Sequence, residues 1–181
     1  QLIAIHPSVA DLPEAVGACV DELRLAYPSH LLLHEHFGER SAMFDKDRLH
    51  QVIGNLVANA VAYGDTRLPV RVTSSTEGST TTVSVHNQGA AIPAELLGRL
   101  FTPLIRGRQE PVKASNVGLG LFIVKQIAKA HAGDVSVLST DEAGTCFSVR
   151  FCLPCTPFVL NGQPLSSSYS EVLVKESGHG R

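Results

Sequence analysis

Apolar residues recur every three to four positions in three stretches of the chain, and each stretch predicts an amphipathic helix. The predicted helices span residues 11–27, 45–63 and 118–131. Asp45 or Asp47 can cap the second helix, because a short acidic side chain accepts hydrogen bonds from the free N–H groups of the first turn. A shorter helix is expected from Ala94 to about Arg99.

Strand patterns lie between these helices. Runs rich in β-branched and apolar residues cover 31–37, 69–75, 80–86, 135–138 and 145–153. Strands and helices mixed in this order predict an α+β fold, in which helices pack on one face of a mixed, mostly antiparallel sheet.

Two segments have no clear periodicity. Residues 102–117 combine Pro, Gly and basic residues, and a loop of this length in a compact domain is usually functional or disordered. From Thr156 onward the chain is rich in Ser, Gly and Pro, and we expect a flexible tail with a weak strand at 172–174. The predicted organisation is therefore one domain over 1–155 and a tail over 156–181. The start, Gln1-Leu2-Ile3, resembles neither an initiator nor a signal peptide, so we expect a piece of a longer protein.

Composition narrows the possible functions. The 181 residues are 44% hydrophobic and 18% charged, with a net charge of −2, which gives no electrostatic reason to expect binding to nucleic acid or a membrane surface. No apolar run approaches the roughly 20 residues that span a bilayer. Cys152 and Cys155 have the spacing of a zinc half-site or a redox pair, but no second close Cys/His pair accompanies them. We expect unpaired thiols in a reducing cytoplasm.

Asn55 and Asn59 lie four residues apart on the second predicted helix, so both amides project from one face. Asn is mildly unfavourable inside a helix, and two on one stripe need a reason. They are either exposed amides without a role or ligands, because a carboxamide oxygen suits a hard cation such as Mg²⁺.

Asn87 ends an alternating strand and is followed by Gly89. A simple turn at the strand end is one explanation. The other is base recognition, because an Asn amide can accept from the amino group of adenine and donate to a ring nitrogen. A glycine at position 89 would let the backbone pass close beneath the base.

Gly118-Leu119-Gly120-Leu121 opens the third long helix directly after the basic loop. Free N–H groups at a helix N-terminus bind phosphates, and glycine allows close approach. A lone Gly-x-Gly is weak by itself. The chain has neither the third glycine of a dinucleotide fingerprint nor the Gly-Lys of a P-loop.

Together, these segments resemble the ATP-binding catalytic domain of bacterial sensor histidine kinases, in the superfamily that includes DNA gyrase, Hsp90 and MutL. The resemblance runs from about Asp11 to Pro154 and implies the two-layer α/β sandwich of that superfamily, the Bergerat-type fold. The matching segments, in order, are 47–63 for the N box, 85–93 for the G1 box, 100–103 for the F box, 117–121 for the G2 box and 144–147 for the final Gly-Thr segment.

The resemblance implies ATP and Mg²⁺ as ligands, with Asn59 on the metal and Asn55 beside the phosphates. Leu104–Val117 would be a mobile lid that brings Arg106 to the phosphates, and Asn55 and Arg106 would be the catalytic residues. The full ATP-binding set that it implies is Asn55, Asn59, Tyr63, Asn87, Gly89, Ala91, Ile92, Arg106, Gly118, Leu119, Gly120, Leu121 and Thr145.

The chain also departs from the family pattern. Asn87 replaces the family's adenine-recognising Asp, Ala91 its second glycine, and Ala62 a frequent Lys or Arg. The amide at 87 loses a charge-assisted bond, about 1–2 kcal/mol, but its oxygen still accepts from adenine. Leu104 stands where Phe is usual, and Asn116 replaces a lid glycine.

The implied function is that of a kinase domain in a two-component system. It would deliver the γ-phosphate of ATP to a histidine on a separate helical dimerisation domain, from which a response regulator takes it. His34-Glu35-His36 is the only segment similar to an acceptor motif. It lacks the motif's Arg and Pro and lies on a predicted strand, so we expect the acceptor outside this chain.

Three alternatives remain open. A hydrolase of the gyrase and Hsp90 kind would need a Glu where Asn55 stands, because an amide cannot act as a base. An anti-sigma serine kinase shares the fold. A degenerate, non-catalytic module that senses nucleotide or docks to a partner would explain Asn87, Ala62 and Ala91.

Overall fold

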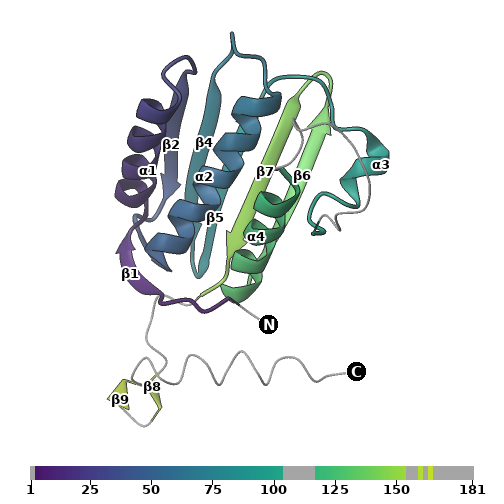
Figure 1. Ribbon diagram of the computed structural model, residues 1–181. Helices are drawn as coiled ribbons and strands as arrows, with labels where there is room; N and C mark the ends of the chain where they lie inside the picture. The colour runs from purple at the N-terminus through teal and green to yellow at the C-terminus, as the bar shows by residue number, and fades with distance from the viewer. Residues whose placement is uncertain (1–2, 104–116, 154–158, 161–162, 165–181) are drawn as a thin grey trace.

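The computed structural model describes residues 3–103 and 117–153, together with two short strands at 159–160 and 163–164. Two layers make up its main body, with three long helices on one face of a five-stranded sheet (Figure 1). The helices are α1 (Leu12–Ala26), α2 (Lys46–Tyr63) and α4 (Val117–Ala130), and the four-residue helix α3 (Ala94–Leu97) lies beside the sheet. The predicted α+β sandwich is confirmed.

The sheet is mixed. Its strands, in spatial order, are β2 (Leu32–Gly38), β4 (Val70–Glu77), β5 (Thr80–Asn87), β7 (Gly144–Phe151) and β6 (Asp134–Thr140). β2 runs parallel to β4, and the other three pairs are antiparallel. Three of the four strand pairs are therefore antiparallel, in agreement with the predicted mostly antiparallel sheet.

A small second sheet was not predicted. β1 (Ser8–Asp11) and β3 (Ser41–Phe44) pair antiparallel at the start of α1 and α2. Strands of four residues are too short to show a period in the sequence. A further pair, β8 (Val159–Leu160) and β9 (Gln163–Pro164), lies in the predicted tail. The rest of that tail, including the strand expected at 172–174, falls outside the described residues, so the tail remains a prediction.

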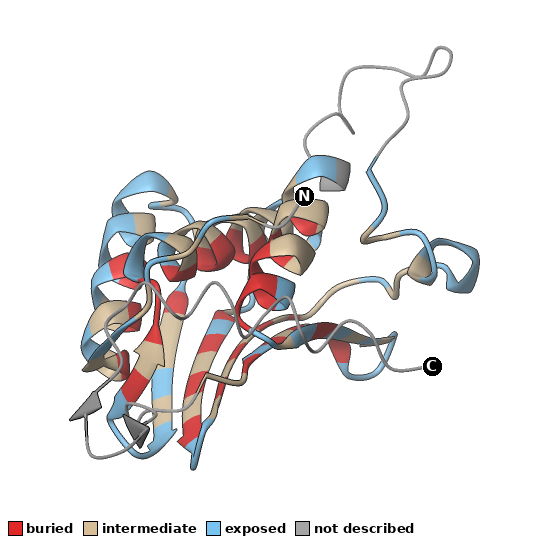
Figure 2. Cartoon of the chain, turned by 90° about the horizontal axis from the view of Figure 1, so that it is seen from below, coloured by how far each residue is buried: buried red, intermediate tan, exposed pale blue. Residues whose placement is uncertain are grey.

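Buried side chains gather between the two layers (Figure 2). β4 and β5 alternate strictly between buried and less buried positions, because successive side chains of a strand point to opposite faces. The largest fully buried side chains are Phe44, Phe151, Leu12, Leu32, Leu49, Ile53, Leu56, Leu121, Ile127 and His131. Burying α2 and α4 against this core fixes their positions relative to each other.

Asp45, rather than Asp47, caps α2, and it also joins α2 to the end of α4. Its Oδ1 accepts a hydrogen bond from the backbone N–H of Arg48 at 3.0 Å. Its own backbone N–H donates to Nε2 of the fully buried His131 at 3.2 Å, while Nδ1 of that ring donates to the Ile127 carbonyl at 2.9 Å. Both ring nitrogens are thus used by a neutral imidazole, and burial lowers the pKa of His131 in agreement with that state.

None of the helices in residues 3–103 and 117–153 is long and apolar enough to cross a bilayer. Cys19, Cys146 and Cys152 are free thiols. Cys155, the other half of the C-x-x-C spacing, lies outside the described residues.

Candidate functional site

The first turn of α4 lies against the middle of α2. A Cβ added to Gly120 would stand 3.3 Å from Oδ1 of Asn55 and 3.5 Å from its Cγ, so glycine leaves just enough room for this amide. Nδ2 of Asn55 is buried and has no hydrogen-bond partner among the described residues. Such a donor is costly to leave unpaired, so each one calls for an explanation. Asn59, one turn further along α2, is half-buried.

The end of α2 is crossed by the chain that leaves β5. A Cβ on Gly64 would collide with the Ala60 carbonyl and stand 3.1 Å from Cβ of Asn87. Gly64 ends the helix as predicted, but its φ of −78° is not left-handed, so close approach is what requires glycine there. Gly89 has a φ of +155°, and a Cβ on it would lie 2.9 Å from the Tyr63 carbonyl. The structure therefore brings the predicted N and G1 segments into contact.

Asn87 occupies the last position of β5 and is only 7% exposed. Its Nδ2 donates to the Gln88 carbonyl at 3.3 Å, which leaves Oδ1 as the acceptor that the side chain can offer to another group. Thr145, 5% exposed, lies directly opposite Asn87 on β7. Asn87, the predicted base-recognition residue, and Thr145, from the predicted ATP-binding set, are thus neighbours on the helix-bearing face of the sheet.

The hairpin between β6 and β7 holds the loop that follows Asn87. The backbone N–H of Ile92 donates to Oγ of Ser139 at 2.9 Å, and the N–H of Ala91 donates to Oδ1 of Asp141 at 2.9 Å. Oγ of Ser139 is also 2.7 Å from Oγ1 of Thr145. The sequence prediction missed Ser139 and Asp141, because nothing in their local pattern marks them until the hairpin register is known.

Phe101, from the predicted F box, packs edge-on against Phe147 with ring centroids 6.2 Å apart. Nζ of Lys125 lies 5.7 Å from the Phe101 centroid. These contacts tie the residues just before the predicted lid to β7 and α4. The lid itself lies outside the described residues up to position 116, and Arg106 with it.

The remaining predicted site residues differ in whether their side chains are accessible to a ligand. Tyr63 is 56% exposed and Leu119 is 58% exposed, so both side chains are accessible. Leu121 is 1% exposed and packs in the core, which leaves only its backbone for a ligand. Gly118 lies in the first turn of α4, as predicted.

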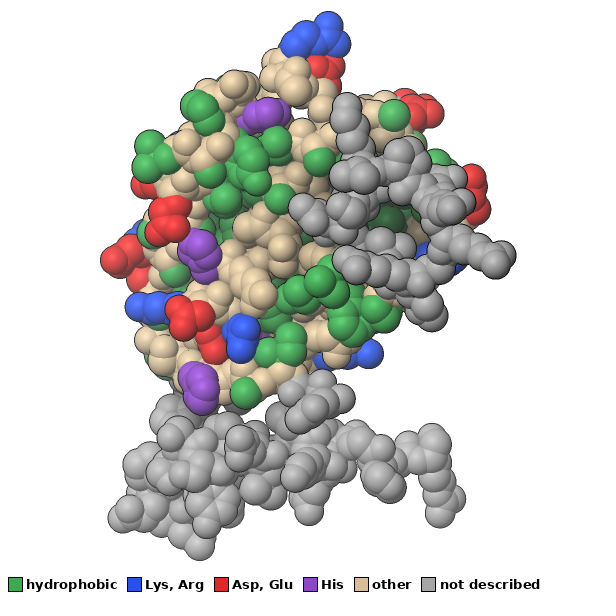
Figure 3. All heavy atoms as spheres, in the orientation of Figure 1, with side chains coloured by type: hydrophobic (Ala, Val, Ile, Leu, Met, Phe, Trp, Pro, Cys, Tyr) green, Lys and Arg blue, Asp and Glu red, His purple; other side chains and the backbone are tan. Residues whose placement is uncertain are grey.

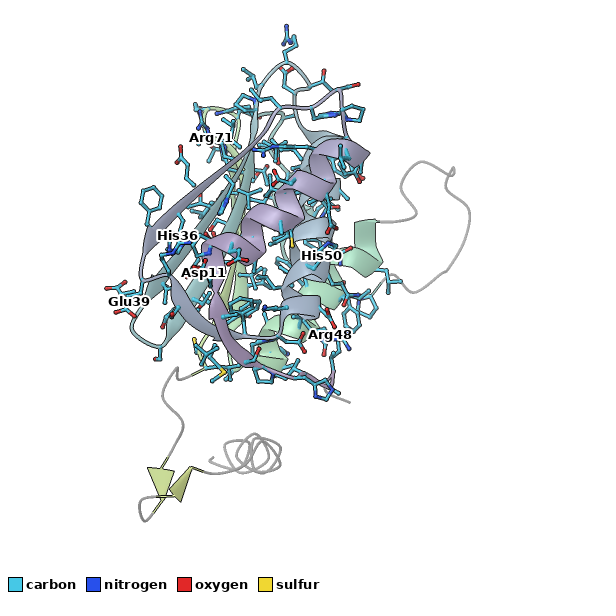
Figure 4. The ribbon with its side chains drawn as sticks, turned by 90° about the vertical axis from the view of Figure 1, so that its left-hand side faces the viewer. Asp11, His36, Glu39, Arg48, His50 and Arg71 are labelled. Carbon is cyan, nitrogen blue, oxygen red and sulfur yellow. The ribbon has the colours of Figure 1, made fainter. Side chains whose placement is uncertain are left out.

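His34 and His36 have a structural explanation on β2. Nε2 of His34 and Nδ1 of His36 lie 3.0 and 2.9 Å from the buried Ser74 hydroxyl. Nε2 of His36 donates to the Glu39 carbonyl at 3.1 Å, on the side of the molecule where Asp11 also lies (Figure 4). Both rings therefore have hydrogen-bonding roles at β2, and the strand predicted for this segment is confirmed.

Acidic and basic side chains are interspersed on the helix-bearing face (Figure 3). A groove of about 320 Å³ lies elsewhere, between α1 and the first turns of α2. Among the described residues no group of three or more His, Cys, Asp or Glu is placed to hold a metal ion.

Known proteins similar to this chain share both its sequence and its fold. The sequence model for histidine kinase-, DNA gyrase B- and HSP90-like ATPases matches residues 44–156. The sensor histidine kinase YkoH of Bacillus subtilis is 30% identical over 152 residues, which are 83% of this chain and 33% of YkoH. The probable sensor histidine kinase TcrY of Mycobacterium tuberculosis is 39% identical over 126 residues, 68% of this chain and 25% of TcrY. The chain thus spans a third or less of the length of both.

Solved structures give the same result. The catalytic domain of histidine kinase ThkA superposes with a TM-score of 0.70 at 26% identity, covering 84% of this chain and 98% of that domain. Full-length ShkA in complex with AMPPNP shares the fold, with a TM-score of 0.71 at 20% identity over 91% of this chain and 34% of ShkA. The chain therefore belongs to the family of histidine kinase-, DNA gyrase B- and HSP90-like ATPases, and the relatives named here are sensor histidine kinases and a histidine kinase catalytic domain.

Proposed function

We propose that this chain binds ATP with Mg²⁺ and delivers its γ-phosphoryl group to a histidine on a separate helical dimerisation domain. A response regulator would be the next acceptor, and the chain would work in the cytoplasm. Its relatives' names support a role in sensor kinase signalling. Since the chain matches only part of their length, the acceptor domain and the signal are properties of the longer protein.

One observation carries the proposal: the buried, unpartnered Nδ2 of Asn55 beside Gly120. A phosphate oxygen at the start of α4 would accept from this amide and from the free N–H groups of the first turn. An unpaired buried donor costs about 1–3 kcal/mol, and a bound phosphate would remove that cost. The site is therefore suited to an anionic ligand.

The metal would be held by Asn59, with Asn55 as the neighbouring amide. Carboxamide oxygens are hard ligands, and Mg²⁺ in nucleotide sites takes only one or two protein oxygens beside water and phosphate. When bound, Mg²⁺ neutralises charge on the phosphates. What this chain's residues contribute is orientation: two amides on one helix face and the N–H groups of the facing helix.

Asn87 and Thr145 would read the base, with Oδ1 of Asn87 accepting from the adenine amino group. Tyr63, accessible at the end of α2, would pack near the nucleotide, and Gly89, Ala91 and Ile92 would form the adjoining backbone. Arg106 would approach the phosphates from the lid. An amide at position 55 has no basic lone pair to activate water, which favours transfer to a partner over hydrolysis.

A second function keeps the pocket but not the transfer. Ala62 is exposed and carries no cation where the family often has one, and Asn87 is uncharged. Both features are compatible with a domain that senses nucleotide without transferring phosphate.

The experiment titrates the chain with ATP, ADP and GTP, with and without Mg²⁺, and then supplies the helical dimerisation domain of the longer protein. Phosphate on a histidine supports the kinase, and binding without transfer supports the sensor. Asn59→Ala should remove the Mg²⁺-dependent part of the affinity, while Gln51→Ala on the same helix should not. If the wild-type chain binds no nucleotide, both functions are wrong.

A further inference from the structure

Ser139 joins two parts of the site that neither the motifs nor the family resemblance connects. It lies on β6 and is half-buried. Its Oγ is 2.9 Å from the backbone nitrogen of Ile92 and 2.7 Å from Oγ1 of Thr145. One hydroxyl thus contacts both the loop after Asn87 and the threonine beside Asn87.

Chemistry fixes the direction of one of these hydrogen bonds and favours one direction for the other. A backbone N–H can only donate, so Oγ of Ser139 accepts from Ile92. At the 2.7 Å between the two hydroxyl oxygens either one could donate. With Ser139 as the donor its proton has Oγ1 of Thr145 as acceptor, whereas the reverse direction leaves that proton without an acceptor among the described hydrogen bonds. In this arrangement the proton of Thr145 is not used by Ser139, and Thr145 can donate it into the site.

Asn87, on the neighbouring strand β5, presents a hydrogen-bond acceptor where Thr145 presents a donor. Because its Nδ2 donates to the Gln88 carbonyl, its Oδ1 is the atom presented as an acceptor. An acceptor on one strand and a donor directly opposite on the next make an ordered pair. A 6-aminopurine presents the matching edge, an amino donor beside the N1 acceptor, whereas a 6-oxopurine presents an acceptor beside an N1–H donor.

We infer that Ser139 is a positioning residue that directs the Thr145 hydroxyl as a donor and thereby makes the site select 6-aminopurine over 6-oxopurine nucleotides. The inference rests on the proposed function, since it concerns the base end of the same site. Ser139 itself need not contact the nucleotide. It acts through Thr145, and it also holds the Ile92 loop in place.

The test compares ATP with inosine triphosphate, which differs at the 6 position and in the proton on N1. Dissociation constants for both are measured on the wild-type chain and on Ser139→Ala, Ser139→Thr and Ser136→Ala. Ser136 is a matched control, because it lies on the same strand and is exposed. The melting temperature of each ligand-free variant reports folding, and Ser139→Cys, with similar volume and a weak donor, replaces Ser139→Ala if that variant unfolds.

Loss of one neutral hydrogen bond predicts ATP binding weaker by a factor of about three to ten in Ser139→Ala. The preference for ATP over inosine triphosphate should fall by a similar factor, because the Thr145 hydroxyl can then turn and accept. Ser139→Thr should restore the preference, and Ser136→Ala should leave it unchanged. In a Thr145→Val background, Ser139→Ala should cause no further loss of preference.

Two results would overturn the inference while leaving the proposed function intact. One is a Ser139→Ala chain with wild-type preference for ATP. The other is equal weakening of both nucleotides, which would mean that Ser139 only supports the loop. If the wild-type chain bound neither nucleotide, the proposed function would be wrong, and the inference that rests on it would be wrong too.

Discussion

Gly120→Ala should separate the stability of this domain from its ability to bind nucleotide. Gly120 lies in the first turn of α4, where alanine is a better helix former. Its added methyl would stand 3.3 Å from Oδ1 of Asn55, closer than most side-chain contacts. The same substitution therefore favours the helix and crowds the site.

The two effects differ in size. Replacing glycine by alanine within a helix stabilises it by about 0.8–1.0 kcal/mol, less near an end. The crowding requires Asn55 to move by a few tenths of an ångström, which offsets part of that gain. We expect a net change between roughly 0 and +1 kcal/mol, or a rise in melting temperature of up to about 2–4 °C for a domain of this size. Displacing the Asn55 amide, which we propose faces the phosphates, should weaken ATP binding at least about tenfold, or 1.4 kcal/mol.

Gly17→Ala is the matched control. Gly17 lies within α1, and the nearest atom to its added Cβ is Nδ1 of His34 at 3.8 Å, an ordinary contact. This variant should gain the full helix stability of about 0.8–1.0 kcal/mol without touching α2 or α4. Urea unfolding gives the stability of each chain, and calorimetric titration with ATP and Mg²⁺ gives the affinity.

The reasoning would be wrong if Gly120→Ala bound ATP as tightly as the wild-type chain. It would also be wrong if the variant lost both binding and stability, because general damage to the fold would then explain the loss. Equal affinity in Gly17→Ala and the wild-type chain shows that helix stabilisation alone does not alter the site.

Two further predictions concern single side chains. Burial lowers the pKa of His131 below its ordinary 6.5, so at pH below about 6.5 the unfolded chain binds a proton that the folded chain does not. Stability should therefore fall as the pH drops from 7 toward 5.5. Urea unfolding of His131→Asn should give a shallower fall over that range, and an identical fall would contradict the assignment. Asn87→Asp should leave ATP affinity unchanged or tighten it by up to about tenfold, because a carboxylate accepts a stronger hydrogen bond. A clear loss of affinity on titration would show that Asn87 does not face the base.

The sequence predicted the long elements of the fold because their periods are long enough to count. α1, α2 and α4 each carry a repeated apolar stripe, and β4 and β5 alternate over eight residues. β1 and β3 have four residues each and depend on pairing with each other, which no local pattern reveals. Their pairing brings together segments at least 30 residues apart.

The sequence indicated candidate site residues where a residue type is unusual for its position. Asn55 within a helix and glycines at a helix start are such signals, and the structure brings Asn55 and Gly120 into contact. Ser139 gave no such signal, because it lies just beyond the strand predicted over 135–138, and alternation along β6 shows only that it faces the opposite side from Ser136. What the sequence does not reveal is the β6–β7 register, which places Ser139 opposite Thr145 and Ser136 opposite Ser148. Register is a property of tertiary pairing, so this part of the site needed the structure.

The hydrogen bond between the Asp45 backbone N–H and His131 joins the two helices that meet at Asn55 and Gly120. It fastens the beginning of α2 to the end of α4, whereas Asn55 meets Gly120 ten residues further along α2, roughly 15 Å away at the rise of an α-helix. Over that distance, rotating α2 relative to α4 by about one degree about this hydrogen bond would change the separation of Asn55 and Gly120 by about 0.3 Å. That displacement is comparable with the clearance around Gly120. A small change at the Asp45–His131 hydrogen bond would therefore shift Asn55 relative to Gly120, at the proposed phosphate end of the site, although neither of these two residues is itself altered.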